Sequence, residues 1–178
     1  MPRCKKCKEK FEALHFNQKY CTKTECFEEW IIKAKAVQWK NKKRRMKEEL
    51  KTTSDYVKEA QKWVNKYVRL RDKDKGCISC GTPLVGKYDA GHFFSAGGHG
   101  SVRFDADGGN INAQCVFCNQ HLHGNIFNYQ KNLIKKIGSE QFNKLEQRSK
   151  GVHKHDKEEL KQLIKEFKQK CKEIENNS

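Results

Sequence analysis

The pattern of apolar and polar positions predicts helices over both ends of the chain. Residues 27–50 contain neither glycine nor proline and are typical of a helix, although the run KNKKRRMK within it has no apolar core position. The residues TTSD at 52–55 supply N-cap side chains for a second helix, which we expect to end at Gly76. One face of that helix carries an apolar stripe, formed by Val57, Ala60, Val64, Tyr67 and Val68.

The C-terminal third predicts three more helices. Two short ones are separated at Gly138, with Ser139 as the cap of the second, and a last helix is capped by Asp156. Apolar residues in the last helix step by four and three positions, as in a two-heptad seam: Leu160, Ile164, Phe167, Cys171 and Ile174. The seam is equally suited to docking on the domain and to pairing with a second copy, and two heptads do not decide between them.

The centre of the chain has a different pattern. Glycines and turns divide residues 77–130, and we expect a strand, a glycine-rich loop, a second strand and then a helix that begins near Cys115. Such a helix would carry Asn119, His121 and His123 on its first turns. The fold class predicted is therefore α+β, with a small mixed core between helical flanks.

Composition makes one large hydrophobic core implausible. The 178 residues are 35% hydrophobic and 34% charged, which favours small metal-stapled modules with exposed helices. A net charge of +16 favours nucleic acid or an anionic membrane surface as partner. No apolar run approaches the roughly 20 residues of a membrane span, and the N-terminus has no apolar signal core, so we expect a soluble, intracellular protein without membrane association.

The charge is unevenly distributed. Residues 1–76 carry 23 Lys and Arg against 11 Asp and Glu, residues 77–130 carry 2 against 3, and residues 131–178 carry 13 against 8. Basic arms therefore flank a nearly neutral centre, a division typical of arms that hold a polyanion around a site that acts on it. We assign phosphate contacts to Lys40, Lys42, Lys43, Arg44 and Arg45; a merely solvated helix face is the alternative.

Eight of the nine cysteines form four close pairs. Cys4, Cys7, Cys21 and Cys26 have the spacing C-x2-C-x13-C-x4-C, and Cys77, Cys80, Cys115 and Cys118 form two CxxC motifs. Both sets are typical of structural zinc sites, because CxxC lets two thiolates reach one tetrahedral ion. We expect Phe11, Phe16 and Tyr20 to cover the first zinc, and Cys171 to be a small buried hydrophobe.

These observations define four segments. We expect an N-terminal Cys4 zinc knuckle at 1–26, a basic helical region at 27–76, a Cys4-zinc core at 77–130 and C-terminal helices at 131–178.

The stretch GNINAQCVFCNQHLHGN adds amides and histidines that a structural zinc does not need. Phosphodiester hydrolysis requires a base that activates water and a cation that stabilises the phosphate. His92, in DAGHF, is suited to be the base. Asn119 directly follows the zinc ligand Cys118, and its amide oxygen suits a hard ion such as Mg²⁺, which Asp89 would share as the nearest carboxylate.

Other polar residues of the centre have supporting roles in this hypothesis. Asn110 would orient the site by bridging the loop and the first strand. His121 is a candidate contact to the ion, to a phosphate or to their surroundings. Arg103 is suited to a phosphate clamp, with a structural salt bridge as the equal alternative. We expect His15, His153 and His155 at the surface.

The motif DAGH followed by GNINAQCVFCNQH resembles an HNH (ββα-metal) nuclease site of the kind supported by a Cys4 zinc. His92, Asn110 and Asn119 match its three characteristic positions. Together with RDKDKGCISCGT, RF and the N-terminal Cys4 element, the chain resembles the phage lambda NinG (Rap) family of recombination endonucleases. Many HNH sites have an aspartate directly before the base histidine; here Gly91 occupies that place and Asp89 lies three positions back, as a ligand or as a merely structural residue.

The resemblance implies a zinc-stapled, treble-clef-like nuclease core that uses Mg²⁺ or Mn²⁺. It implies cutting of branched DNA, such as Holliday junctions and D-loops, in phage recombination within the cytoplasm of a bacterial host. Cutting two opposed strands would require two active sites, so we expect a homodimer, with the C-terminal seam as one candidate interface. The alternatives are a non-enzymatic zinc protein that binds DNA in recombination or regulation, and an HNH nuclease for ordinary duplex.

Overall fold

A computed structural model describes residues 1–177 and divides them into two compact units, residues 1–51 and residues 52–177. The boundary falls inside the segment 27–76 that we expected as one basic helical region, because the second helix packs into the core of the second unit. The last residue of the segment 131–178 lies outside the described residues.

The first unit consists of a small cysteine-centred element and one long helix, α1 (Thr24–Glu49). The helix begins earlier than expected because Cys26, a member of the cysteine cluster, lies in its first turn. Phe11 and Tyr20 pack on the cluster, but Phe16 is 92% exposed and does not cover it. Cys26 is the buried residue of α1, and most of the other residues of this helix are exposed.

In the second unit, α2 (Thr53–Arg71) begins at a capping box. The Thr52 hydroxyl accepts from the backbone N–H of Asp55, whose carboxylate accepts from the backbone N–H of Thr52. The helix ends at Arg71 rather than at Gly76, because Asp72 turns inward and its carboxylate accepts from the backbone N–H of Ala113. The residues buried along α2 include three of the predicted stripe, together with Tyr56: Tyr56, Ala60, Val64 and Val68.

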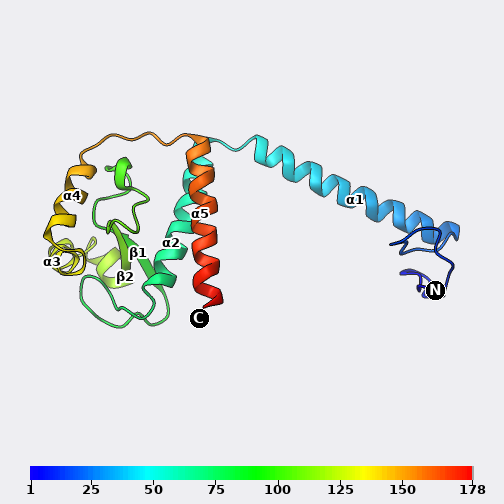
Figure 1. Cartoon of the computed structure of the whole chain (residues 1–178), viewed down its shortest axis with the longest axis horizontal. Coiled ribbons are helices and arrows are strands. Elements are labelled where there is room, and N and C mark those ends of the chain that lie inside the picture. Colours follow the sequence, from blue (N-terminus) through cyan, green and yellow to red (C-terminus); the bar gives the residue numbers. More distant parts are fainter. Residues whose placement is uncertain (178) are drawn as a thin grey trace. The chain divides into compact units, whose positions relative to one another are not determined.

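The last helix, α5 (Lys157–Asn176), lies alongside α2 (Figure 1). Asp156 caps it, as predicted, by accepting from the backbone N–H of Glu159. The seam residues Leu160, Ile164, Phe167 and Cys171 are buried against α2. Each large side chain buried in this way contributes about 1.5–3 kcal/mol. The seam therefore docks within the chain and is not available as a dimer interface.

A two-stranded antiparallel sheet lies at the centre of the second unit. It pairs β1 (Tyr88–His92) with β2 (Ile111–Cys115), so that Asp89 faces Gln114 and His92 faces Ile111. The loop between the strands contains a short 3-10 turn, η1 (Gly100–Val102). One face of the sheet packs on α2, and Figure 1 shows the remaining helices of this unit on the opposite side from α2 and α5.

Those remaining helices are α3 (Ile126–Ile137) and α4 (Ser139–Ser149), which turn at Gly138 as predicted. Ser139 is the first residue of α4 and makes no cap hydrogen bond with its side chain, since Gly138 occupies the cap position. A second apolar cluster joins these helices to η1, with Val102, Tyr129, Leu133, Phe142 and Leu145 as buried members.

The segment after β2 differs from the expected helix. In its place there is only a single π-helical turn, η2 (Phe117–His121), which includes the zinc ligand candidate Cys118. The chain then passes through positive φ at His123 (48°), Gly124 (91°) and Asn125 (45°) before α3 begins. These left-handed residues end the turn, because an α-helix requires negative φ throughout. His123 therefore does not share a helix with Asn119.

None of the helices within residues 1–177 is both long enough and apolar enough to cross a membrane.

Candidate functional site

Each predicted zinc tetrad comes together in space. The sulfurs of Cys4, Cys7, Cys21 and Cys26 lie within 4.8 Å of one another, as do those of Cys77, Cys80, Cys115 and Cys118. The Sγ atoms of Cys7 and Cys21 are 3.7 Å apart, and those of Cys80 and Cys115 are 3.8 Å apart. A tetrahedral ion with Zn–S bonds of about 2.3 Å places its sulfurs about 3.8 Å apart. Both tetrads therefore fit zinc.

Hydrogen bonds favour ionisation of one thiol in each tetrad. Burial alone would raise the pKa of Cys80, but contacts from Thr82 outweigh it and lower the pKa to about 6. In the first unit, burial likewise opposes ionisation of Cys4, yet hydrogen bonding by the backbone of Cys21 helps to lower its pKa to about 6. Thiolate is the form that binds zinc, so each tetrad contains a cysteine that ionises readily.

The turn η2 brings amides to the carboxylate of Asp89. Asn119 Nδ2 donates to Asp89 Oδ2 at 2.9 Å, and Gln120 Nε2 donates to the same oxygen at 2.8 Å. Because Asn119 follows Cys118, the zinc tetrad and this contact share one turn of chain. The structure thus brings Asp89 and Asn119 together through the amide N–H of Asn119.

Gly91 lies beside the side chains of Asn119 and Gln114. A Cβ on Gly91 would lie 2.1 Å from Gln114 Oε1 and 3.2 Å from Asn119 Oδ1, so these two amide oxygens converge in front of the glycine. Gln114 is fully buried, and its Oε1 has no hydrogen-bond partner. A buried acceptor without a donor is costly unless a cation or water satisfies it. The side-chain oxygens of Asp89, Asn119 and Gln114 are ligands that suit a hard divalent ion.

His92 projects from the other face of β1. Its Nε2 lies 3.1 Å from the backbone carbonyl of Arg103 and 3.5 Å from Gln61 Nε2 on α2. A carbonyl only accepts, so Nε2 carries the ring hydrogen and Nδ1 keeps the lone pair. Burial lowers the pKa of His92, and the Arg103 guanidinium also favours the neutral form. The imidazole is therefore neutral at pH 7 and able to accept a proton.

Asn110 is a fully buried clamp on the backbone around this histidine. Its Oδ1 accepts from the N–H of Phe94, and its Nδ2 donates to the carbonyls of Phe94 and Val102. The side chain thereby ties the end of β1 to the loop that carries Arg103. Asn110 contacts backbone only, so its geometry is that of an orienting residue.

Arg103 lies beside His92 and makes no salt bridge among the described residues. Its guanidinium donates to Gln61 Oε1 at 3.3 Å and to the carbonyl of Ala96 at 3.2 Å. Neither partner neutralises its charge. A cation beside the candidate base, held by neutral acceptors, is suited to bind an anionic group.

The remaining candidates have exposed side chains. His121 is exposed and stacks beside Phe117, with 5.8 Å between ring centroids, while Gln120 contacts Asp89 in its place. The candidate phosphate contacts on α1 are exposed and belong to the other unit: Lys40, Lys42, Lys43, Arg44 and Arg45.

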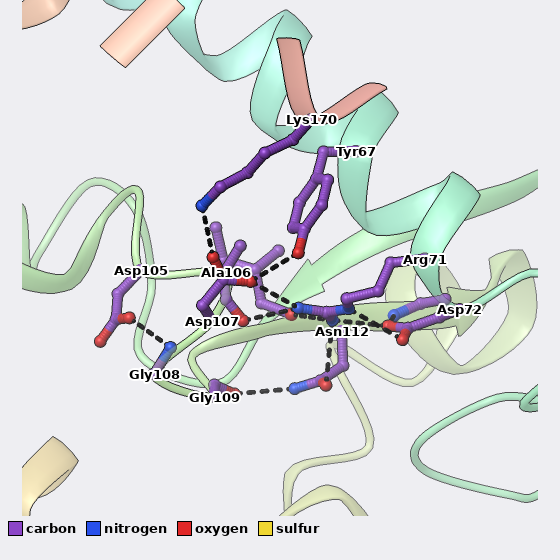
Figure 2. Close-up of polar contacts among 12 residues, drawn as sticks. Tyr67, Arg71, Asp72, Asp105, Ala106, Asp107, Gly108, Gly109, Asn112 and Lys170 are labelled. Carbon is purple, nitrogen blue, oxygen red and sulfur yellow. Dashed lines mark hydrogen bonds and ion pairs between the residues drawn. The ribbon is translucent and has the colours of Figure 1, made fainter. Parts of the chain in front are cut away.

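A buried ion pair holds β2 in place (Figure 2). Arg71, at the end of α2, pairs with Asp72 and donates to the carbonyls of Ala106 at 2.7 Å and Ile111 at 3.0 Å. Asp72 also accepts from the N–H of Ala113. Burial would raise the pKa of Asp72, but Arg71 outweighs it and lowers the pKa to about 2. The pair fixes the strand that leads into the second CxxC motif.

Sequence reasoning missed three glutamines near the site. Gln114 and Gln120 lie around Asp89 and Asn119, and Gln61 lies beside His92 and Arg103. Glutamines are common on solvated surfaces, so composition gave no reason to select them. The cross-strand pairing of Asp89 with Gln114 would have indicated one of them, had the register of the hairpin been known.

Comparison with known proteins gives a consistent family assignment. A family model described as "Bacteriophage Lambda NinG protein" matches residues 1–177. The chain is 35% identical to "Protein ninG" of Escherichia phage 933W over 98% of this chain and 94% of the relative. It is 40% identical to "Protein ninG" of Escherichia phage lambda, over 72% of this chain and 61% of the relative, and 40% identical to that of Salmonella phage P22, over 72% and 62%. No solved structure matches the chain.

Proposed function

The chain belongs to the bacteriophage NinG family, and we propose that it is a divalent-metal-dependent DNA endonuclease of the HNH type. One arrangement carries the proposal. A neutral, carbonyl-oriented histidine ends β1, and a cluster of carboxylate and amide oxygens gathers around Asp89 and Gly91 of the same strand. A protein that only binds DNA has no need of either group.

His92 is the general base of the proposed reaction. With Nε2 held by the carbonyl of Arg103, Nδ1 accepts the proton of a water that attacks the phosphorus. Asn110 fixes the backbone on both sides of this contact. Arg103 binds a nonbridging phosphate oxygen with its guanidinium and so orients the phosphodiester towards the histidine.

Asp89 and Asn119 would hold the Mg²⁺ or Mn²⁺ ion, with Gln114 as a third oxygen donor. When bound, the ion supplies charge stabilisation to the phosphate and to the leaving oxygen. Asp89 takes over the role of the aspartate that many HNH sites carry directly before the base. Gly91, which occupies that position here, leaves room for the two amide oxygens.

We further propose branched DNA, such as Holliday junctions and D-loops, as substrate. The exposed basic side chains of α1 would add phosphate contacts from the first unit, and a structural zinc in each unit would stabilise the fold around it. Two opposed cuts need two active sites, so we propose a homodimer whose interface lies outside the buried seam of α5. The protein would act in the cytoplasm of the bacterial host.

A cleavage assay at fixed low salt tests this proposal. A synthetic four-way junction and a linear duplex with the same arms are incubated with wild type or His92→Ala, with Mg²⁺, Mn²⁺ or EDTA. We expect metal-dependent cutting of the junction that His92→Ala abolishes without loss of junction binding. His15→Ala, which changes an exposed histidine of the other unit, serves as control and should cut normally. Binding without cutting under either ion would instead establish a DNA-binding accessory protein.

A further inference from the structure

Three potential metal ligands meet where the last helix begins. His153, His155 and Glu159 place one ligand atom each within 4.8 Å of one another. They belong neither to a cysteine tetrad nor to the candidate nuclease centre. The first two lie in the segment before α5, and Glu159 lies in its first turn.

The orientation of His155 is fixed by its surroundings. Its Nε2 lies 3.2 Å from the carbonyl of Gly100, and its ring packs on Phe104 with 4.9 Å between centroids. Because the carbonyl only accepts, Nε2 carries the hydrogen and Nδ1 presents a lone pair. This Nδ1 is buried without a hydrogen-bond donor and lies 3.2 Å from Glu159 Oε1. When His155 is neutral, two acceptors face one another here, an arrangement that a bound cation satisfies.

The second histidine completes the cluster from the solvent side. His153 Nε2 lies 2.8 Å from Glu159 Oε1 and 3.0 Å from Oε2. Gly100 allows this approach, because a Cβ there would lie 2.8 Å from the backbone oxygen of His153. The cluster therefore depends on close contact between two segments about 50 residues apart in sequence. The segment before α5 supplies the two histidine ligands, and the segment around Gly100 orients them.

We propose that His153, His155 and Glu159 form a third metal site, for a first-row divalent transition ion such as Zn²⁺. Two imidazole nitrogens and one carboxylate are a donor set that such ions bind in proteins, with the remaining positions open to water. Nitrogen donors favour these ions over Mg²⁺ or Ca²⁺, which prefer oxygen. The donated hydrogen bond from His155 to Gly100 is the supporting contact that metal-bound histidines usually make.

The position of this site gives it a structural consequence. His155 contacts Gly100 and Phe104. Arg103, which lies between Gly100 and Phe104 in the sequence, accepts a hydrogen bond from His92 with its backbone carbonyl. A metal that joins His155 to the first turn of α5 would hold the loop 100–104 against that helix. Binding would therefore stabilise the second unit near the candidate base, whether or not the protein is a nuclease.

Metal titration of the full-length protein tests the inference. Wild type is purified with its two cysteine-bound zinc ions, freed of loose metal by gel filtration, and titrated with Zn²⁺ in a calorimeter. His153→Gln and Glu159→Gln remove a ligand from half-exposed positions and so leave the fold intact. Glu158→Gln and His15→Gln are matched controls, since both change exposed side chains of the same type outside the cluster.

We expect wild type and both controls to bind one further Zn²⁺ per chain, more weakly than the cysteine sites, and to show a higher Tm with added Zn²⁺. The variants His153→Gln and Glu159→Gln should lose the additional binding event and the rise in Tm while keeping two zinc ions. The inference is overturned if wild type takes up no third ion, or if these two variants bind it as wild type does. Neither result depends on cleavage activity.

Discussion

Asp89 and His92 lie three residues apart on β1, yet their side chains leave the strand on opposite faces. Asp89 meets Asn119 and Gln120 of η2, whereas His92 reaches the carbonyl of Arg103 and Gln61 of α2. The alternation of a β-strand produces this separation, since neighbouring side chains point to opposite sides. The strand thus separates a proposed cation site from a proposed base, and each can be tested apart from the other.

Replacing Asp89 by asparagine should separate cleavage from binding. The amide keeps the shape of the side chain but removes the charge that would hold a divalent ion, so we expect junction cleavage to fall by at least about 100-fold, comparable to removal of a single catalytic donor. Junction affinity should be unchanged at fixed salt, as measured by gel shift. Asp74→Asn, at an exposed position, is the control and should cut normally. Full cleavage activity of Asp89→Asn would exclude Asp89 as a ligand of the divalent ion.

Adding one methyl group at Gly91 should disturb the same site. The new Cβ would approach Gln114 Oε1 to 2.1 Å and Asn119 Oδ1 to 3.2 Å, so the buried glutamine must move. We expect Gly91→Ala to lower the free energy of unfolding by about 1–3 kcal/mol, the usual cost of overpacking, and to reduce cleavage. Gly97→Ala is matched, because a Cβ there meets nothing within 4 Å. Urea unfolding of both variants measures the difference, and equal stabilities would argue against the crowding.

The pH dependence of cleavage should reflect the burial of His92. Burial lowers the pKa of this histidine below 6.5, and only its neutral form accepts a proton. The rate should therefore fall as the pH drops through a midpoint below 6.5, with full activity retained above that value. Single-turnover rates at saturating metal, across pH 5 to 8 at constant ionic strength, measure the midpoint. An acidic limb centred above 6.5 would exclude a buried histidine as the base.

Asp72→Asn should destabilise the second unit strongly. The substitution removes the nearer counter-charge of the partly buried Arg71 guanidinium and leaves it, among the described residues, only Asp107, 3.7 Å away, and breaking such a pair costs about 3 kcal/mol or more. Urea unfolding of zinc-replete protein at pH 7 measures the loss. The exposed variant Asp74→Asn should remain within about 0.5 kcal/mol of wild type. A similarly small effect of Asp72→Asn would mean that Asp107 and the carbonyls of Ala106 and Ile111 satisfy Arg71.

The two zinc sites should be separable by mutation. Cys80→Ser should reduce the tightly bound zinc, measured after gel filtration, from two ions to one per chain and unfold the second unit. Cys7→Ser should also leave one ion but preserve the second unit, as followed by its near-UV circular dichroism. Cys171→Ala is the control, because Cys171 packs against α2 outside both tetrads and should retain two ions. Two ions in Cys80→Ser would reassign the second tetrad.

Local sequence signals predicted much of the architecture. The Thr52 and Asp156 caps, the turn at Gly138 and both cysteine tetrads lie where short-range patterns indicated them, because capping and CxxC chelation depend on residues a few positions apart. The early end of α2 was not predicted, because it depends on a residue distant in sequence. The carboxylate of Asp72 accepts from the backbone N–H of Ala113 in β2, and the helix stops before it. The short length of η2 was not predicted either. His123, Gly124 and Asn125 have positive φ and interrupt a sequence that is otherwise compatible with a helix.

The sequence by itself determined which residues are chemically able to act: paired thiols for zinc, a histidine at a strand end, a carboxylate nearby and a basic helix. Only the tertiary structure decided which of them meet. Packing of α5 on α2 buried a seam that was equally suited to a dimer, and the hairpin register brought Gln114 opposite Asp89. The approach of the segment before α5 to Gly100 joined His155 to Glu159. Such contacts span tens of residues, and a local pattern contains no information about which distant surface will satisfy a given side chain.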